Sequence, residues 1–221
     1  MMRFFRLINI MGTKPQLHSY FRYISCWSCG KNTNNLVVNL FCSNCNALQH
    51  PEFKENYFKI MGTNETYDLE ESELAKKFKE LQKYLHPDKF ANKPEQEQEI
   101  SEKYSSLVNE AYKTLLDPLS RGIYMLKLRG IEISENTEID QEFLMTIMEK
   151  NEEVENADTE EEIMKLNKEN KEHIKNLQKK VSQAFFDGDL KSVTKLLHHM
   201  KYYTSIDNQI QAVIRNKGII R

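Results

Sequence analysis

The sequence has 221 residues, of which 31 are Lys or Arg and 33 are Asp or Glu, so its formal net charge is −2. With 39% hydrophobic and 29% charged residues, the composition is typical of a folded chain with one or two cores. No apolar run approaches the roughly 18 residues of a membrane span, and the near-neutral charge disfavours a protein that coats nucleic acid by charge alone. We therefore expect neither a membrane nor a nucleic acid as a partner.

The amino-terminal segment is basic and apolar. Its first carboxylate is Glu52, and arginines stand among large apolar residues at its start. This pattern predicts an amphipathic presequence over residues 1–25, which are otherwise expected to be disordered, and hence import into the mitochondrial matrix. Arg6 and Asn9 interrupt the apolar core that a secretory signal requires. A basic tail without a targeting role and an additional cytosolic pool remain open.

All four cysteines lie in two Cys-x-x-Cys pairs, Cys26 with Cys29 and Cys42 with Cys45. In each pair two thiolates of one tight turn can point at a common centre, and two such turns supply the four ligands of tetrahedral Zn²⁺. We predict a structural zinc ribbon over residues 26–50, with a hairpin formed from the β-prone residues 36–41. Two disulfides, a redox dithiol or iron in the same cage are the alternatives.

Residues 55–130 predict a hairpin of two long helices. The first helix carries one apolar stripe, formed by Leu74, Phe78, Leu81 and Leu85. Its outer face is expected to be basic, with Lys76, Lys77, Lys79 and Lys83. A second stripe begins at Ile100 and ends at Leu115, because the residue before Pro118 is disfavoured in a helix. The two stripes can bury each other only if the helices pair antiparallel.

Between the two helices lies His86-Pro87-Asp88. Pro87 ends the first helix because it lacks an N–H group and clashes with the preceding turn. His86 and Asp88 are therefore expected at a rigid corner beside the lysines. A fixed carboxylate next to ammonium groups predicts a docking surface for a partner with acidic residues and an arginine. The alternative is a corner that only connects two helices.

From Asp140 onward the sequence is helical and highly charged. Thr159 with Glu162 predicts a capping box, and residues 187–189 predict the end of one helix and the start of the next. We predict an antiparallel three-helix bundle over residues 138–210, with a coiled coil as the lesser alternative. His198 and His199 are expected to be surface residues.

The first bundle helix has apolar residues on two sides. The face expected in the core holds Ile139, Phe143, Ile147 and Val154. Three further apolar residues fall well off that face, namely Leu144, Met145 and Met148, and Tyr202 lies off the core stripe of the last helix. Such residues predict either an exposed binding patch or a helix that is buried on both sides.

The His86-Pro87-Asp88 corner between these helices resembles the J domain, by which co-chaperones stimulate ATP hydrolysis in DnaK-type chaperones. The chain from Cys26 to about Ile206 is similar to the J-domain co-chaperones of iron–sulfur cluster assembly, the bacterial HscB type and its mitochondrial counterpart. The resemblance is carried by the cysteine pairs with residues 47–49, and by residues 57–58, 108–115, 118–122, 126–130 and 143–145. The cysteine pairs are typical of the animal mitochondrial branch.

Together, the patterns and the resemblance predict a mostly α-helical fold: a J-domain helical hairpin, a carboxy-terminal antiparallel three-helix bundle and a small amino-terminal zinc ribbon. The resemblance implies an adaptor rather than an enzyme. The corner and the four lysines would engage a DnaK-type ATPase chaperone, and the bundle would bind an IscU-type scaffold protein. The positions that match the scaffold-binding surface of HscB-like proteins are Leu144, Met145, Met148, Glu149, Glu152 and Tyr202, the last replacing a bacterial Phe.

Other functions are less favoured. A general J-domain co-chaperone for unfolded clients usually has a Gly/Phe-rich linker and repeated cysteine modules, which this sequence lacks. An enzyme would require a nucleophile–base pair, a phosphate loop or an open metal site, and no such pattern is found in the sequence. A zinc ribbon that binds nucleic acid would require a cluster of Lys and Arg, which the cysteine region does not have.

Overall fold

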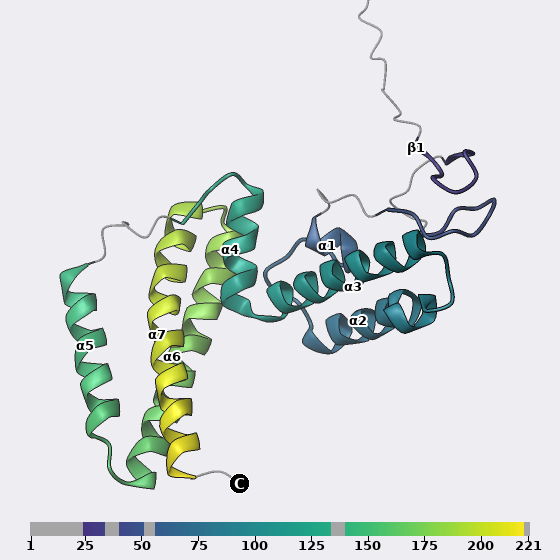
Figure 1. Cartoon of the computed structure of the whole chain (residues 1–221). Helices are drawn as coiled ribbons and strands as arrows, with labels where there is room; N and C mark the ends of the chain where they lie inside the picture. Colours follow the sequence, from purple (N-terminus) through teal and green to yellow (C-terminus); the bar gives the residue numbers. More distant parts are fainter. Residues whose placement is uncertain (1–23, 34–39, 51–55, 134–139, 219–221) are drawn as a thin grey trace, which may run out of the picture. The chain divides into compact units, whose positions relative to one another are not determined.

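A computed structural model describes residues 24–33, 40–50, 56–133 and 140–218 (Figure 1). The chain divides into two compact units, Met1–His50 and Pro51–Arg221. The described residues do not include most of the predicted presequence or most of the predicted hairpin segment. They also do not include Ile139, which is predicted to lie in the core. Among the helices described, none has the combination of length and apolar character needed to cross a bilayer.

The described part of the first unit consists of two small turns, each closed by antiparallel pairing. Strand β1 (Ile24–Ser25) pairs with β2 (Asn32–Thr33) in antiparallel fashion around the first cysteine pair. Phe41 and Leu48 form a single antiparallel bridge around the second cysteine pair. The indole of Trp27 donates a 2.7 Å hydrogen bond to the carbonyl of Leu48 and thereby ties the first turn to the second.

The described part of the second unit is helical. Its elements are α1 (Tyr57–Ile60), α2 (Glu71–Leu85), the 3-10 turn η1 (Pro87–Phe90), α3 (Glu95–Leu116), α4 (Pro118–Leu128), α5 (Gln141–Asn156), α6 (Glu160–Phe186) and α7 (Leu190–Lys217). This order confirms the prediction of a mostly α-helical chain with a helical hairpin followed by three long helices.

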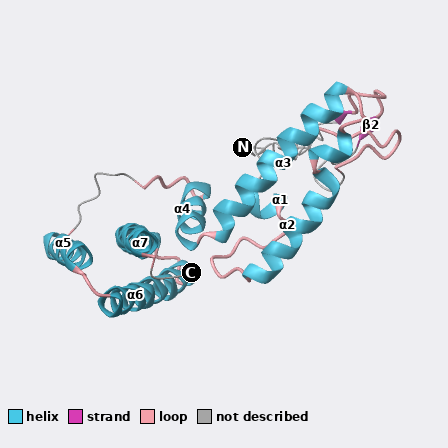
Figure 2. Ribbon diagram, turned by 60° about the horizontal axis from the view of Figure 1, so that its bottom comes forward, coloured by secondary structure: helices cyan, strands magenta, loops and turns pink. Residues whose placement is uncertain are grey.

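Helices α2 and α3 run side by side as the predicted hairpin (Figures 1 and 2). Their apolar stripes are buried, including Leu74 and Leu85 on α2 and Ile100 and Val108 on α3. The rings of Phe78 and Tyr112 stack with centroids 4.2 Å apart. Each helix alone would be only marginally stable in water, and burial of the two stripes against each other stabilises both helices.

Helix α7 is the centre of the carboxy-terminal bundle and contacts α4, α5 and α6. Figure 2 shows α5 and α7 nearly along their axes. The predicted capping box is present, since Thr159 caps α6 and Glu162 accepts from the Thr159 backbone. Gly188 adopts a φ of +73° in the short connection, and Asp189 then caps α7. The predicted helix boundaries at residues 158–159 and 187–189 are therefore confirmed.

His198 corrects one prediction, because it is not a surface residue, whereas His199 is half-buried. His198 is only 6% exposed, and the ring of His199 stacks on that of Phe143 with centroids 3.8 Å apart. Helix α7 packs against three other helices, so more than one of its faces is covered. If α7 is assumed to have only one buried stripe, too many of the α7 residues are predicted to be exposed to solvent.

Helix α4 joins the hairpin to the bundle at a close approach. A Cβ atom on Gly122 would lie 2.6 Å from Cδ2 of Leu197 on α7, so this position favours glycine. Near the same junction, Tyr67 stacks on Phe185 at 5.5 Å, and the Ser182 hydroxyl donates a hydrogen bond to Asp68. These contacts fix the segment before α2 against the end of α6.

Candidate functional site

The four cysteine sulfurs converge on one point. All four Sγ atoms lie within 4.8 Å of one another, with 3.6 Å between Cys26 and Cys45 and 3.8 Å between Cys29 and Cys42. A tetrahedral zinc ion with Zn–S bonds of about 2.3 Å separates its sulfurs by about 3.8 Å. All four side chains are free thiols, so they form no disulfides. The donor set therefore fits a four-coordinate metal ion.

The two turns that carry the cysteines have the same backbone construction. The N–H of Gly30 donates to the carbonyl of Cys26 at 2.9 Å, and the N–H of Asn46 donates to the carbonyl of Cys42 at 2.8 Å. Gly30 and Asn46 have φ values of 68° and 57°, a region that Gly and Asn tolerate better than other residues. Gly30 in the first turn and Asn46 in the second therefore have the same role.

Burial and hydrogen bonds shift the thiol pKa values in different directions, lowering those of Cys26 and Cys29 and raising that of Cys45. Burial alone would raise the pKa of Cys26, but backbone N–H groups, including that of Ser28, and the Gln49 amide lower it to about 6. The backbone of Ala47 lowers the pKa of Cys45, yet burial and the neighbouring thiols raise it to about 11. Four thiolates at this spacing need a cation between them to ionise together. Gln49 is a supporting residue that the sequence analysis did not assign to the site.

The His86-Pro87-Asp88 corner points two polar side chains outward. His86 ends α2 in an extended conformation, with φ −62° and ψ 131°, and Pro87 begins η1. The side chains of His86 and Asp88 are 52% and 89% exposed, and Nδ1 of His86 lies 3.5 Å from the Asp88 carboxylate. Both groups are thus available to a partner.

The inner side of the corner is anchored in the hairpin core. Leu85 and Phe90, which flank the motif, are 1% and 5% exposed. The buried hydroxyl of Ser101 on α3 donates a 2.9 Å hydrogen bond to the carbonyl of Leu85, one of the last carbonyls of α2. Helix ends leave such carbonyls without helical partners, so Ser101 both satisfies this group and fixes the turn. The sequence analysis did not identify this role for Ser101.

The lysines of α2 form two groups. Lys76, Lys79 and Lys83 are exposed and lie within about 60° of one another around the helix, and we call these three the basic face. Lys77 lies about 100° from Lys76, is half-buried and donates a hydrogen bond to the carbonyl of Gly62. Lys77 therefore departs from the prediction of four lysines on one outer face.

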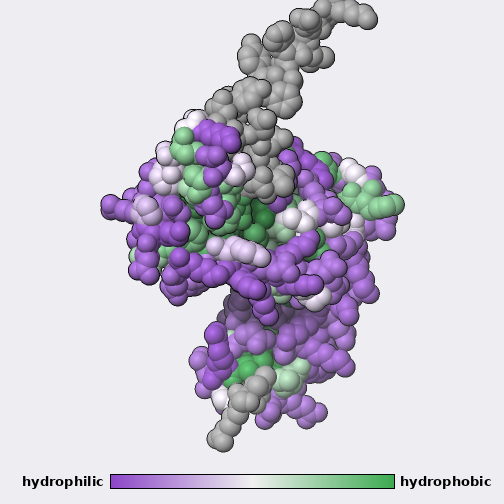
Figure 3. Space-filling view, turned by 90° about the vertical axis from the view of Figure 1, so that its right-hand side faces the viewer, coloured by the Kyte–Doolittle hydropathy of each residue, from purple (hydrophilic) through white to green (hydrophobic). Residues whose placement is uncertain are grey.

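Viewed from the side on which α2 and α3 lie in Figure 1, the surface is mainly hydrophilic (Figure 3).

Helix α5 has the two predicted faces. Ile147 and Val154 are each 5% exposed and belong to the bundle core, whereas Met145 and Met148 are each 63% exposed. The predicted alternative of burial on both sides is therefore wrong for the two methionines. Large exposed apolar side chains on one helix face are a feature of protein-binding surfaces.

The remaining candidate residues extend or border this face of α5. Leu144 is half-buried, and Glu149 and Glu152 are exposed. With the two methionines they lie within about 140° of one another around the helix, and we call these five residues the α5 face. Tyr202 on α7 is half-buried, and its ring meets that of Phe143 edge-on with centroids 5.7 Å apart. Tyr202 is thus joined to α5 through Phe143.

Comparisons with known families match both parts of the helical unit. The DnaJ domain matches residues 56–124, and the HSCB C-terminal oligomerisation domain matches residues 139–211.

Individual relatives extend the similarity over most of the chain. The iron–sulfur cluster co-chaperone protein HscB of Homo sapiens is 39% identical over 192 residues, which cover 86% of this chain and 82% of that protein. The mouse protein of the same name is 38% identical over 189 residues, which cover 84% and 81%. The crystal structure of human co-chaperone protein HscB superposes with a TM-score of 0.81 at 38% identity and covers 86% of this chain and 98% of that one.

Proposed function

Because the chain belongs to the HscB family of iron–sulfur cluster co-chaperones, we propose that it delivers an IscU-type scaffold protein to a mitochondrial DnaK-type chaperone and stimulates the ATPase of that chaperone. The family is one of co-chaperones, so in this proposal the chain binds its partners and the chaperone hydrolyses ATP. The observation that carries the proposal is the corner at His86 and Asp88, which is exposed on its outer side and anchored on its inner side.

The chaperone would dock on the corner and the basic face. Asp88 presents a carboxylate that can accept two hydrogen bonds from one arginine of a partner, and Lys76, Lys79 and Lys83 suit acidic residues around it. Stimulation then requires only that the chain bind the hydrolysis-competent state of the chaperone more tightly than the other state. The anchored backbone of the corner favours tight docking, because little backbone freedom remains to be lost on binding.

The scaffold would bind the α5 face and Tyr202. Met145 and Met148 supply adaptable apolar area, which is suited to a partner surface of irregular shape. Glu149 and Glu152 border this area and would pair with basic residues of the scaffold. The core side of α5 packs against α7 independently of these residues, so the face is presented by a helix that is already folded.

The cysteine cluster would hold one structural zinc ion. Cys26, Cys29, Cys42 and Cys45 would supply all four ligands, and a tetrahedral site filled by protein leaves no position for a substrate. Bound metal would supply the folding free energy that so few buried side chains cannot supply alone. A matrix location follows from the presequence expected over residues 1–25.

The proposal is tested by capturing partners from a mitochondrial extract with the full chain, with and without ATP. Recovery of an IscU-type scaffold together with a DnaK-type chaperone, the latter dependent on ATP, is the expected outcome. The Asp88→Asn variant is expected to recover the scaffold alone. Recovery of many unrelated unfolded proteins with no enrichment of the scaffold would contradict the proposal.

A further inference from the structure

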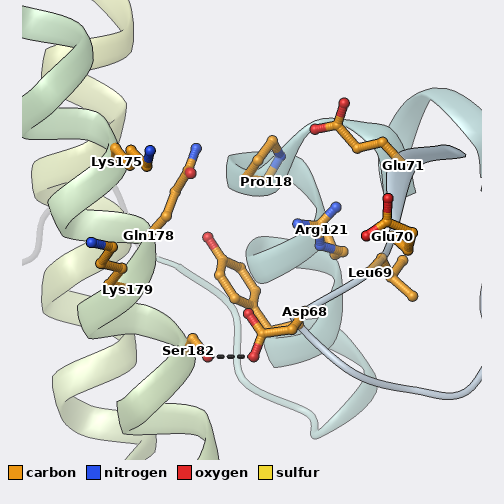
Figure 4. A pocket seen from close by; sticks show the side chains of 11 residues that line it. Asp68, Leu69, Glu70, Glu71, Pro118, Arg121, Lys175, Gln178, Lys179 and Ser182 are labelled. Atoms are coloured by element: carbon orange, nitrogen blue, oxygen red, sulfur yellow. Dashed lines mark hydrogen bonds between the residues drawn. The ribbon is translucent and has the colours of Figure 1, made fainter.

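A pocket of about 530 Å³ lies where the hairpin meets the bundle, separate from both docking surfaces (Figure 4). Its walls come from residues 67–71, from the start of α4 and from α6. Lys175, Gln178 and Lys179 lie along α6 on one side, and Arg121 lies on the opposite side. A pocket of this size is within the range that holds small molecules.

Arg121 is a buried cation that forms no direct ion pair with a described carboxylate. Its side chain is 6% exposed, one terminal nitrogen donates to the carbonyl of Leu115, and its guanidinium lies 5.1 Å from the centre of the Tyr67 ring. The Nε–H of Arg121 has no hydrogen-bond partner among the described residues. None of the ion pairs between described residues includes Arg121. Burial lowers the pKa of Arg121, and the nearby Tyr67, Asp117 and Asp68 offset this only in part. Because arginine keeps its charge in proteins, an anion or water at the free Nε–H would stabilise the buried group further.

Tyr67 supplies a second unpaired donor to the same pocket. It is 4% exposed, and its hydroxyl has no partner among the residues that the structure describes. Burial raises the pKa of Tyr67, so the hydroxyl keeps its proton and can donate. Its ring is held between Arg121 and Phe185, which fixes the direction of the hydroxyl. A buried donor without an acceptor is unfavourable, and a ligand oxygen would satisfy it.

The charges around the pocket limit the ligand that fits. Lys175 and Lys179 form no ion pair with a described carboxylate and can turn toward a ligand on flexible stems. Asp68 also lines the pocket, and its carboxylate accepts a hydrogen bond from the Ser182 hydroxyl. Glu70 and Glu71 line the pocket as well, and their negative charge would repel an extended polyanion.

We propose that this pocket binds a single phosphate group, either as inorganic phosphate or as part of a small phosphorylated molecule. A phosphate offers several acceptor oxygens and close to two negative charges, which match the two fixed donors and the two lysines. A carboxylate has fewer oxygens and less charge, so it satisfies fewer of these groups. A bound phosphate would contact the segment before α2, α4 and α6 at once and would stabilise the folded state of the unit.

The test is titration of the full chain with inorganic phosphate at constant ionic strength, followed by calorimetry and by the melting temperature of the helical unit. Phosphate is expected to bind and to raise the melting temperature, whereas acetate and chloride at equal ionic strength are not. If glycerol phosphate binds as tightly as inorganic phosphate, or more tightly, the result supports the proposal and indicates that the ligand is a small phosphorylated molecule. Pyrophosphate is expected to bind more weakly than phosphate.

Two variants and one control make the assignment specific. Tyr67→Phe removes only the unpaired hydroxyl, so it should leave the ligand-free protein at least as stable and weaken phosphate binding about tenfold. The double variant Lys175→Ala/Lys179→Ala should weaken binding by a similar factor. The control Lys168→Ala/Lys180→Ala changes two exposed lysines of the same helix that do not line the pocket. Absence of phosphate binding, equal binding of acetate, or equal effects of the test and control variants would overturn the proposal.

Discussion

The backbone N–H of Asp88 donates a 3.3 Å hydrogen bond to Nδ1 of His86, so the two residues of the corner orient each other. Neither side chain takes part in the hairpin core, which Leu85 and Phe90 hold from the inside. The contact is local and does not hold α2 against α3. The corner therefore combines a fixed geometry with side chains that can be changed without unfolding the hairpin.

We predict that Asp88→Asn and His86→Gln each abolish stimulation of the chaperone ATPase. Both side chains are exposed, so the free energy of unfolding should change by no more than about 0.5 kcal/mol. Single-turnover ATP hydrolysis and thermal unfolding measure the two effects. Glu102→Gln removes the charge of an exposed carboxylate on α3 and serves as the control, with full stimulation expected. A large loss of stability in Asp88→Asn would show that the corner is only structural.

The basic face should contribute to association with the chaperone. The triple variant Lys76→Ala/Lys79→Ala/Lys83→Ala is expected to raise the concentration for half-maximal stimulation about tenfold and to weaken its dependence on salt. Lys77→Ala should leave stimulation unchanged and lower the free energy of unfolding by about 1 kcal/mol, because Lys77 donates to the carbonyl of Gly62. ATPase titrations at two salt concentrations distinguish the variants, and a triple variant that behaves like wild type would exclude the basic face.

The corner could be predicted from sequence because its causes are local. The apolar spacing gives the two helices, and Pro87 ends the first of them, so the exposure of Asp88 follows from neighbouring residues. The position of Lys77 could not be predicted in this way. Its partner is a backbone carbonyl fifteen residues away at Gly62, which only the folded chain brings close.

The two exposed methionines of α5 should carry a large part of scaffold binding. We predict that Met145→Ala/Met148→Ala weakens scaffold affinity at least about tenfold with little change in stability, since both side chains are 63% exposed. Calorimetric titration with the scaffold and thermal unfolding measure these effects. Met164→Ala on α6, also an exposed methionine, is the matched control and should bind normally.

A core variant of the same helix tests the assignment of the two faces of α5. Ile147 is 5% exposed, and Ile147→Ala should lower the free energy of unfolding by about 2–5 kcal/mol. A comparable loss of stability in Met145→Ala/Met148→Ala would place the methionines in the core and would contradict the binding surface.

The bundle also marks where sequence patterns stop being informative. The capping residues Thr159 and Asp189 follow from local chemistry, and both are in the predicted places. The burial of His198 and the unpaired groups of Tyr67 and Arg121 depend on helices that meet from distant parts of the chain. Periodicity within one helix contains no information about how many neighbours cover it.

Metal removal should affect the two units differently. We predict one zinc ion per chain by elemental analysis, and loss of ordered structure around the four cysteines when a strong chelator removes it. The melting transition of the helical unit should remain. The Cys42→Ser variant should bind metal far more weakly, whereas Ser43→Ala, next to it in the sequence, should not. Two disulfides and no metal in freshly purified protein would contradict the zinc site.

The most direct measurement is the ATP hydrolysis rate of the mitochondrial DnaK-type chaperone with the chain alone, with the scaffold alone and with both. We predict that the chain accelerates hydrolysis and that the scaffold and the chain together accelerate it by more than the sum of their separate effects. The acceleration should disappear with Asp88→Asn. A rate that the wild-type chain leaves unchanged, with the scaffold bound and the corner intact, would contradict the proposed coupling.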